Sequence, residues 1–99
     1  MKWLTLAKIK DQLRLEPDYT LEDDKLTGYG NSAEQQILNL IGCRFDDLIE
    51  EYGEVPAPLV EASLMLVDNS YNNPSPSTQG TQNYTLYGLE LKVKPYIKL

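Results

Sequence analysis

The strongest constraint on the fold is an apolar stretch of eighteen residues, Val55 to Asn72, which opens with two nearby prolines. Pro56 and Pro58 suit the first turn of a helix, where a missing N–H group costs nothing. Apolar side chains then recur at helical spacing over more than half of the circumference, as in a helix at the centre of a small bundle. These side chains are Leu59, Val60, Ala62, Leu64, Leu66, Val67 and Tyr71.

Two shorter patterns predict amphipathic helices on either side of a longer one. Thr5 is a suitable N-cap for a helix over Leu6–Leu13, with Pro17 beyond its end. Residues 45–52 form the second pattern, which opens with Asp46 and Asp47 and stops at Gly53.

A long helix is predicted between these two patterns, from a capping box at Thr20 to a stop at Gly42. Gly28 and Gly30 lie inside it, and each costs up to about 1 kcal/mol relative to alanine. A kink, a close approach by another backbone, and two helices in place of one therefore remain open. The predicted buried face consists of Leu21, Leu26, Tyr29, Ala33, Ile37, Leu40 and Ile41.

A polar segment and a second apolar segment follow the central helix. Residues 72–86 are rich in Pro, Ser, Asn, Gln and Thr, so we predict a flexible polar loop. In the tail, Leu89, Leu91 and Val93 alternate with charged residues, which is a strand pattern. Leu86, Leu89 and Val93 also fit one helical face ending before Pro95. Periodicity leaves helix and strand open.

The tail is also a candidate interface. The free energy gained by burying its few apolar side chains is nearly cancelled by the entropic cost of ordering the tail. The tail should therefore be stable only if these side chains are almost fully buried, and a neighbouring subunit is one surface that could bury them. Amphipathic aromatic side chains in and before the tail favour interfaces, although core positions remain open for them. The candidate interface residues are Tyr84, Tyr87, Leu89, Leu91, Val93, Pro95 and Tyr96.

The composition excludes several kinds of chemistry. The chain has no histidine, which removes Ser-His and Cys-His catalysis and histidine-based zinc sites. Cys43 is the single cysteine, so no intrachain disulfide or multi-cysteine metal site can form, and a small buried hydrophobe is expected there. The acids at positions 46, 47, 50 and 51 have the spacing of a solvated helix surface. We predict no enzyme activity, catalytic residue, cofactor, metal site or small-molecule substrate.

The charge balance and the short apolar runs limit the partners further. A net charge of −6 argues against nucleic acid as a sequence-specific partner, because such binding requires Lys and Arg against phosphates. The longest apolar run, Ala62 to Val67, is far below the roughly 20 residues that cross a bilayer, so no membrane contact is predicted. One cysteine and no export signal favour a reduced intracellular compartment.

The order of elements resembles the head–tail connector (adaptor) family of tailed bacteriophages, often labelled as DNA-packaging proteins. The residues that carry the resemblance are the proline-led helix from Val55-Pro56 to Leu64-Met65-Leu66-Val67-Asp68-Asn69-Ser70-Tyr71, the polar loop, and the tail Leu91-Lys92-Val93-Lys94-Pro95-Tyr96. The resemblance implies an all-α fold without catalytic activity. It also implies a ring of copies beneath the capsid portal, through which DNA passes, with the loop and tail contacting neighbours or the portal.

These observations lead to one interpretation and one alternative. We expect residues 1–99 to form a single all-α domain, a small bundle of four to five helices with a long polar loop before a short C-terminal segment. The expected function is that of a phage or prophage head–tail connector, located in the virion neck and in the host cytoplasm during assembly. The alternative is a small bacterial helical module for protein interaction or regulation.

Overall fold

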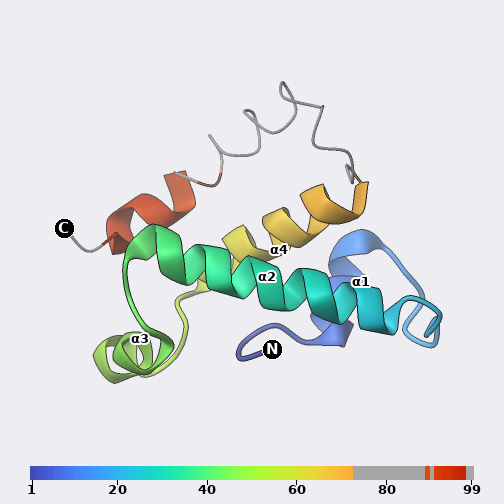
Figure 1. Cartoon of the computed structure of the whole chain (residues 1–99), viewed down its shortest axis with the longest axis horizontal. Coiled ribbons are helices and arrows are strands. Elements are labelled where there is room, and N and C mark those ends of the chain that lie inside the picture. The colour runs from blue at the N-terminus through green and yellow to red at the C-terminus, as the bar shows by residue number, and fades with distance from the viewer. Residues whose placement is uncertain (73–88, 90, 98–99) are drawn as a thin grey trace.

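A computed structural model describes residues 1–72, 89 and 91–97 (Figure 1). These residues form helices and no strand. Leu89 and residues 91–93 are α-helical, so the tail adopts the helical alternative. The all-α bundle expected from the sequence is confirmed. Its elements are α1 (Leu6–Leu13), α2 (Asp23–Ile41), α3 (Phe45–Tyr52), α4 (Ala57–Asn72) and the 3-10 helix η1 (Lys94–Tyr96).

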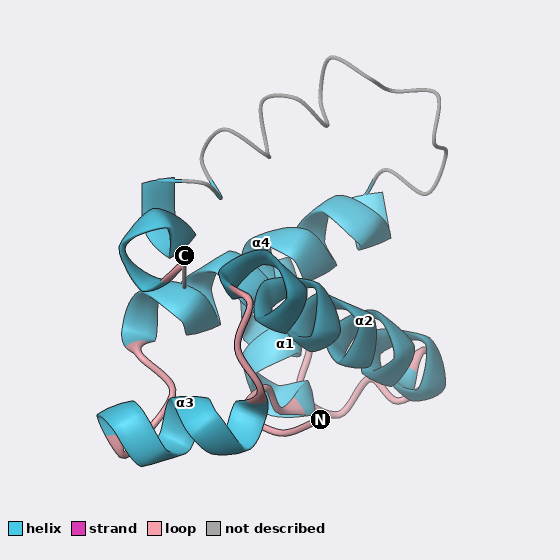
Figure 2. Cartoon of the chain, turned by 60° about the vertical axis from the view of Figure 1, so that its left-hand side comes forward, coloured by secondary structure: helices cyan, strands magenta, loops and turns pink. Residues whose placement is uncertain are grey.

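The core lies between α2 and α4, which run side by side in opposite directions (Figure 1). α1 packs against both of them, and α3 and the C-terminal segment lie at the end where α2 finishes (Figures 1 and 2). The predicted central role of α4 is thus confirmed. The fully buried apolar residues of this pair are Leu26, Ile37 and Ile41 of α2 and Leu59, Ala62 and Val67 of α4.

Helices α1 and α3 have the bounds that their local signals predict. The Thr5 side chain accepts a hydrogen bond from the Lys8 backbone N–H at 3.1 Å, as an N-cap should. Gly53 ends α3 in the left-handed conformation, with φ of 79°. Tyr52 belongs to the amphipathic pattern of residues 45–52, but it is exposed at the end of α3 and lies outside the core.

Helix α2 is continuous, but its start and its buried face differ from the prediction. The helix begins at Asp23 after Glu22, which makes no side-chain cap, so the capping box expected at Thr20 does not form. Leu21 therefore precedes the helix and is 87% exposed, and Leu40 lies on the solvent side of the last turn. Both had been assigned to the buried face. Gly42 ends the helix with φ of 68°, as predicted.

The glycines inside α2 have different surroundings. A Cβ atom added to Gly30 would lie 2.2 Å from Met1 Sδ and 3.1 Å from Ile9 Cδ1. An added Cβ at Gly28 would meet nothing within 4 Å. Gly30 therefore leaves room for the side chains of Met1 and Ile9. The sequence had left open a close approach by another backbone, whereas the three atoms nearest to the added Cβ are side-chain atoms.

The remaining expectations concern the loop and the cysteine. Asn72, the first residue of the predicted loop 72–86, is the last residue of α4, and the rest of that loop lies outside the described residues. Cys43 is half-buried against the core, and its thiol donates to the Arg44 carbonyl at 3.3 Å.

Candidate assembly interface

The N-terminal segment is held on α2 by a buried carboxylate that the sequence pattern did not single out. Glu34 accepts backbone N–H groups from Lys2 at 2.7 Å, Trp3 at 2.9 Å and Leu4 at 2.8 Å. Charge-assisted hydrogen bonds of this kind are stronger than those between neutral groups. The acid therefore ties residues 2–4 to the middle of α2.

Trp3 continues this attachment across the molecule. Its indole N–H donates to Ser63 Oγ on α4 at 2.9 Å, and Ser63 donates to the Leu59 carbonyl at 2.8 Å. The indole stacks on Phe45 at the start of α3, with ring centroids 6.0 Å apart. One side chain near the N-terminus thus contacts both α3 and α4, which holds α3 against the α2–α4 pair.

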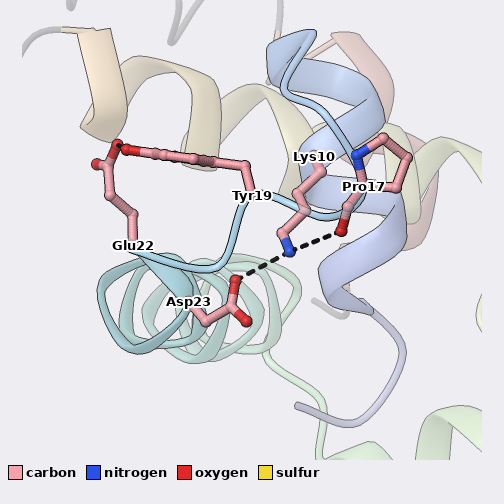
Figure 3. Close-up of polar contacts among 5 residues, drawn as sticks. All are labelled: Lys10, Pro17, Tyr19, Glu22 and Asp23. Atoms are coloured by element: carbon pink, nitrogen blue, oxygen red, sulfur yellow. Dashed lines mark hydrogen bonds and ion pairs between the residues drawn. The ribbon is translucent and has the colours of Figure 1, made fainter.

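The turn between α1 and α2 is closed by a buried lysine (Figure 3). Lys10 Nζ lies 2.9 Å from Asp23 Oδ1 and donates to the Pro17 carbonyl at 3.2 Å (Figure 3). Lys10 and Asp23 form an ion pair, but the geometry of this contact is not that of a hydrogen bond. Asp23 Oδ1 is buried and has no hydrogen-bond partner among the described residues. A buried ion pair adds little net stability, but losing one partner would strand a buried charge.

A cluster of one carboxylate and two tyrosines joins the start of α2 to the end of α4. The hydroxyls of Tyr19 and Tyr71 donate to Glu22 Oε1 at 2.8 Å and 3.0 Å (Figure 3 shows Tyr19 and Glu22). These two hydrogen bonds, with Tyr19 first, lower the pKa of Glu22 below its ordinary value of 4.5. The hydrogen bond to Glu22 also raises the pKa of each tyrosine. The cluster fixes the last turn of α4, from which residues 73–88 continue.

The candidate interface residues of the tail occupy two kinds of position. Leu89 and Val93 are each 1% exposed and belong to the core of this chain. Leu91, between them in sequence, is 62% exposed, as expected when a helix presents one face inward. Pro95 is exposed and Tyr96 is half-buried. Tyr84 and Tyr87 lie outside the described residues, and contact of the whole set with another protein remains a prediction.

Contacts with α4 and α3 hold this C-terminal segment. Lys92 Nζ forms an exposed ion pair with Glu61 Oε2 at 2.9 Å. The Tyr96 ring meets the Tyr52 ring edge to face, with centroids 5.6 Å apart. An aromatic pair of this geometry adds roughly 0.5–1.5 kcal/mol beyond area burial. These side-chain contacts attach the segment at the end of the molecule where α2 and α3 meet.

Four exposed apolar side chains belong to elements at that same end. Leu40 lies in the last turn of α2, Tyr52 is the last residue of α3, and Leu91 and Ile97 belong to the C-terminal segment. Both views place these three elements at one end of the molecule (Figures 1 and 2). We call these four residues the apolar end. Exposed apolar groups that cluster typically mark a protein contact.

The acidic residues of α3 lie on its surface. Asp46, Asp47, Glu50 and Glu51 are all exposed, in agreement with a solvated helix surface. No group of three or more metal-binding side chains occurs within residues 1–72, 89 and 91–97. A hollow of about 580 Å³ beside the start of α3 is lined by Lys2 and Arg44 as well as Asp46 and Asp47, so it has no dominant charge.

The exposed side chains of the apolar end make it a candidate contact with other proteins. The chain belongs to the phage gp6-like head-tail connector protein family, which it matches over residues 4–96. No curated protein and no solved structure matches it. Membership makes the chain a structural connector component of a phage virion that interacts with other head or tail proteins. Within the described residues, no helix has the length and apolar character needed to cross a bilayer.

Proposed function

We propose that copies of this chain form a ring between the portal and the neck or tail components, and that DNA passes through the ring. The proposal is carried by membership of the head-tail connector family over residues 4–96. A ring needs a contact between two different surfaces of the same chain, because such head-to-tail contacts close into cyclic assemblies. The apolar end supplies one candidate surface.

The composition of the apolar end supports its role in this contact. The centre of an interface between proteins is depleted in charge and enriched in aromatic and apolar side chains. Leu91 and Leu40 are exposed leucines, and Tyr52 adds an aromatic ring. Covering them with a second copy or with the portal removes apolar surface from water, which favours association.

In this proposal the predicted interface residues have two roles: some hold the C-terminal segment in place, and the others contact the neighbour. Leu89 and Val93 anchor the C-terminal segment through burial, while Leu91, Pro95 and Tyr96 face or border the neighbour. Tyr84 and Tyr87 precede the segment and are proposed as additional contacts. The net charge of −6 suits a ring through which DNA must slide, because negatively charged side chains do not attract the phosphates of DNA.

The proposal is tested by assembling the chain with the portal protein of the same phage and measuring subunit number by native mass spectrometry and electron microscopy. The wild-type chain should form closed rings on the portal. Leu91→Ser should abolish or strongly reduce them while leaving the helical circular dichroism spectrum unchanged. Leu21→Ser is the matched control, because Leu21 is also an exposed leucine but precedes the opposite end of α2. Absence of rings from the wild-type chain would refute the function itself.

A further inference from the structure

We propose that in the assembled ring the C-terminal segment of each copy docks on the body of its neighbour, in the place that its own segment occupies here. We define the tail site as the part of the body that receives Leu89 and Val93, bordered by Glu61 of α4 and Tyr52 of α3. The occupant is a second copy of the same segment. This inference rests on the proposed ring.

The contacts at the tail site are indifferent to which copy supplies the segment. Among the described residues they include two buried aliphatic side chains, the Lys92–Glu61 ion pair and the Tyr96–Tyr52 ring contact. The ion pair and the ring contact each join a side chain of the segment to a side chain of the body. A neighbouring segment would make the same contacts, which is why exchange of identical elements is a low-cost route to assembly.

The length of chain between α4 and the segment permits the exchange. Residues 73–88 separate the end of α4 from Leu89. Glu61, which pairs with Lys92, lies about 16 Å from Asn72 along α4, at 1.5 Å per residue. Residues 73–88 can span up to about 55 Å when extended. That reach exceeds the 38 Å longest dimension of the chain, so an adjacent body lies within range.

The surroundings decide which copy is bound. In a dilute single chain, the connection raises the effective concentration of the chain's own segment to about the millimolar range, so that segment occupies the site. In a closed ring the neighbouring segment is held at a similar concentration, and the advantage of the chain's own segment is lost. The linkage of each copy to the next would then add to the contact made by the apolar end.

The Lys92–Glu61 ion pair allows a direct test without engineered residues. A carbodiimide joins an amine and a carboxylate that touch, and this pair is 2.9 Å apart. Chains labelled with nitrogen-15 are mixed with equal amounts of unlabelled chains and assembled on the portal. The rings are treated with the carbodiimide, digested, and the peptide that joins position 61 to position 92 is weighed.

If every segment is exchanged, about half of these linked peptides carry one labelled and one unlabelled partner, because neighbours in the ring mix at random; a smaller exchanged fraction lowers this share in proportion. The same peptide from dilute single chains should be labelled on both sides or on neither. Rings that yield only uniformly labelled or unlabelled pairs would refute the exchange and leave the ring intact as a function. Failure to form rings would refute the proposed function and this inference with it.

Lys92→Arg is the matched control variant. Arginine retains the positive charge and can pair with Glu61, but its guanidinium does not form an amide with a carbodiimide-activated acid. The linked peptide should therefore disappear from both rings and single chains, while ring formation persists. If this variant still yielded a cross-linked peptide with the same pattern of labelled masses, the cross-link would involve another lysine. The assignment of the cross-link to Lys92 and Glu61 would then be wrong.

Discussion

At the scale of single residues, Gly28 and Gly30 show how similar sequence positions acquire different roles. Both glycines reduce helix propensity, but only Gly30 has neighbours that need the missing side chain. Met1 and Ile9 fill the space over Gly30, beside the segment whose N–H groups bind Glu34. The absence of a side chain thus helps to seat the N-terminal residues on α2.

Replacement of each glycine by alanine should separate these roles. Gly28→Ala should stabilise the fold by about 0.5–1 kcal/mol, because alanine favours the helix and its Cβ meets nothing. For a chain of this size the melting temperature should rise by about 2–8 °C, measured by circular dichroism. Gly30→Ala should give a smaller gain or a loss, because Met1 and Ile9 must move. Equal gains in both variants would show that the close approach costs nothing.

The Glu22 cluster predicts how stability depends on pH. A lowered folded pKa means that the Glu22 contribution is complete above 4.5 and is lost as pH falls through the lower folded value. Tyr71→Phe removes one of the two hydroxyl donors. The variant should be less stable than the wild type at neutral pH, and the difference should shrink as the solution is acidified below 4.5.

This dependence can be measured by urea unfolding between neutral pH and about pH 3. The control is Tyr29→Phe. The ring centroids of Tyr29 and Tyr71 each lie 5.9 Å from Lys25 Nζ. The hydroxyls that donate to Glu22 are those of Tyr19 and Tyr71. A Tyr71→Phe difference that stays constant with pH would contradict the role of the carboxylate. The contribution of Tyr19 and Tyr71 depends on pH in the opposite direction. Because their pKa values are raised in the folded chain, their contribution to stability is complete below pH 10.0 and is lost as the pH rises through the folded values.

At the scale of elements, the C-terminal segment shows what its sequence pattern could not decide. A strand would place Leu89, Leu91 and Val93 on one face, whereas a helix separates Leu91 from the other two. The helix is observed, with Leu89 and Val93 inward and Leu91 outward. Packing against the α2–α4 core supplied the information that periodicity lacked.

Alanine substitutions in the segment test this arrangement. Leu89→Ala should cost roughly 2–5 kcal/mol, because it opens a cavity in the core. Leu91→Ala should change the free energy of unfolding by less than about 0.5 kcal/mol, since the side chain is mostly in water. Urea unfolding followed by circular dichroism measures both. Comparable losses at the two positions would contradict the helical face.

How well each helix could be predicted depended on how local its signals are. The bounds of α1 follow from Thr5 and those of α3 from Gly53, because caps act over a few residues. The start of α2 was missed because Thr20 lies in a turn, where its carbonyl accepts from the Asp23 N–H at 3.2 Å. The solvent-facing positions of Leu21 and Leu40 show that an apolar residue near a helix end need not join the core.

The polar contacts that hold the elements together were beyond local patterns. Glu34 and Lys10 are charged residues, which usually lie in water, so nothing in their neighbourhoods indicated burial. Ser63 falls on the broad apolar face predicted for α4, but its partner could not be predicted. Their partners are brought near only by the fold: the N-terminal backbone for Glu34 and the Trp3 indole for Ser63. The apolar end likewise combines three segments, and of its four residues only Leu91 was predicted as an interface candidate.

At the scale of the whole molecule, charge predicts behaviour toward DNA. The net charge is −6, and α3 exposes four acids on its surface. We expect no complex with duplex DNA at about 0.1 M salt, because binding depends on cations that displace counterions from phosphates. An electrophoretic mobility assay at micromolar protein, with a basic protein of similar size as the positive control, measures this. A retarded band that weakens as salt is added would contradict the expectation.

Trp3 is the chain's one tryptophan, and its burial between Phe45 and Ser63 has a practical consequence. An indole in this setting loses its shielding from water when the N-terminal residues, α3 or α4 move away. Its ultraviolet emission should therefore shift to longer wavelength whenever any of these parts detaches. The intrinsic fluorescence of Trp3 therefore reports whether the fold is intact, without an added dye.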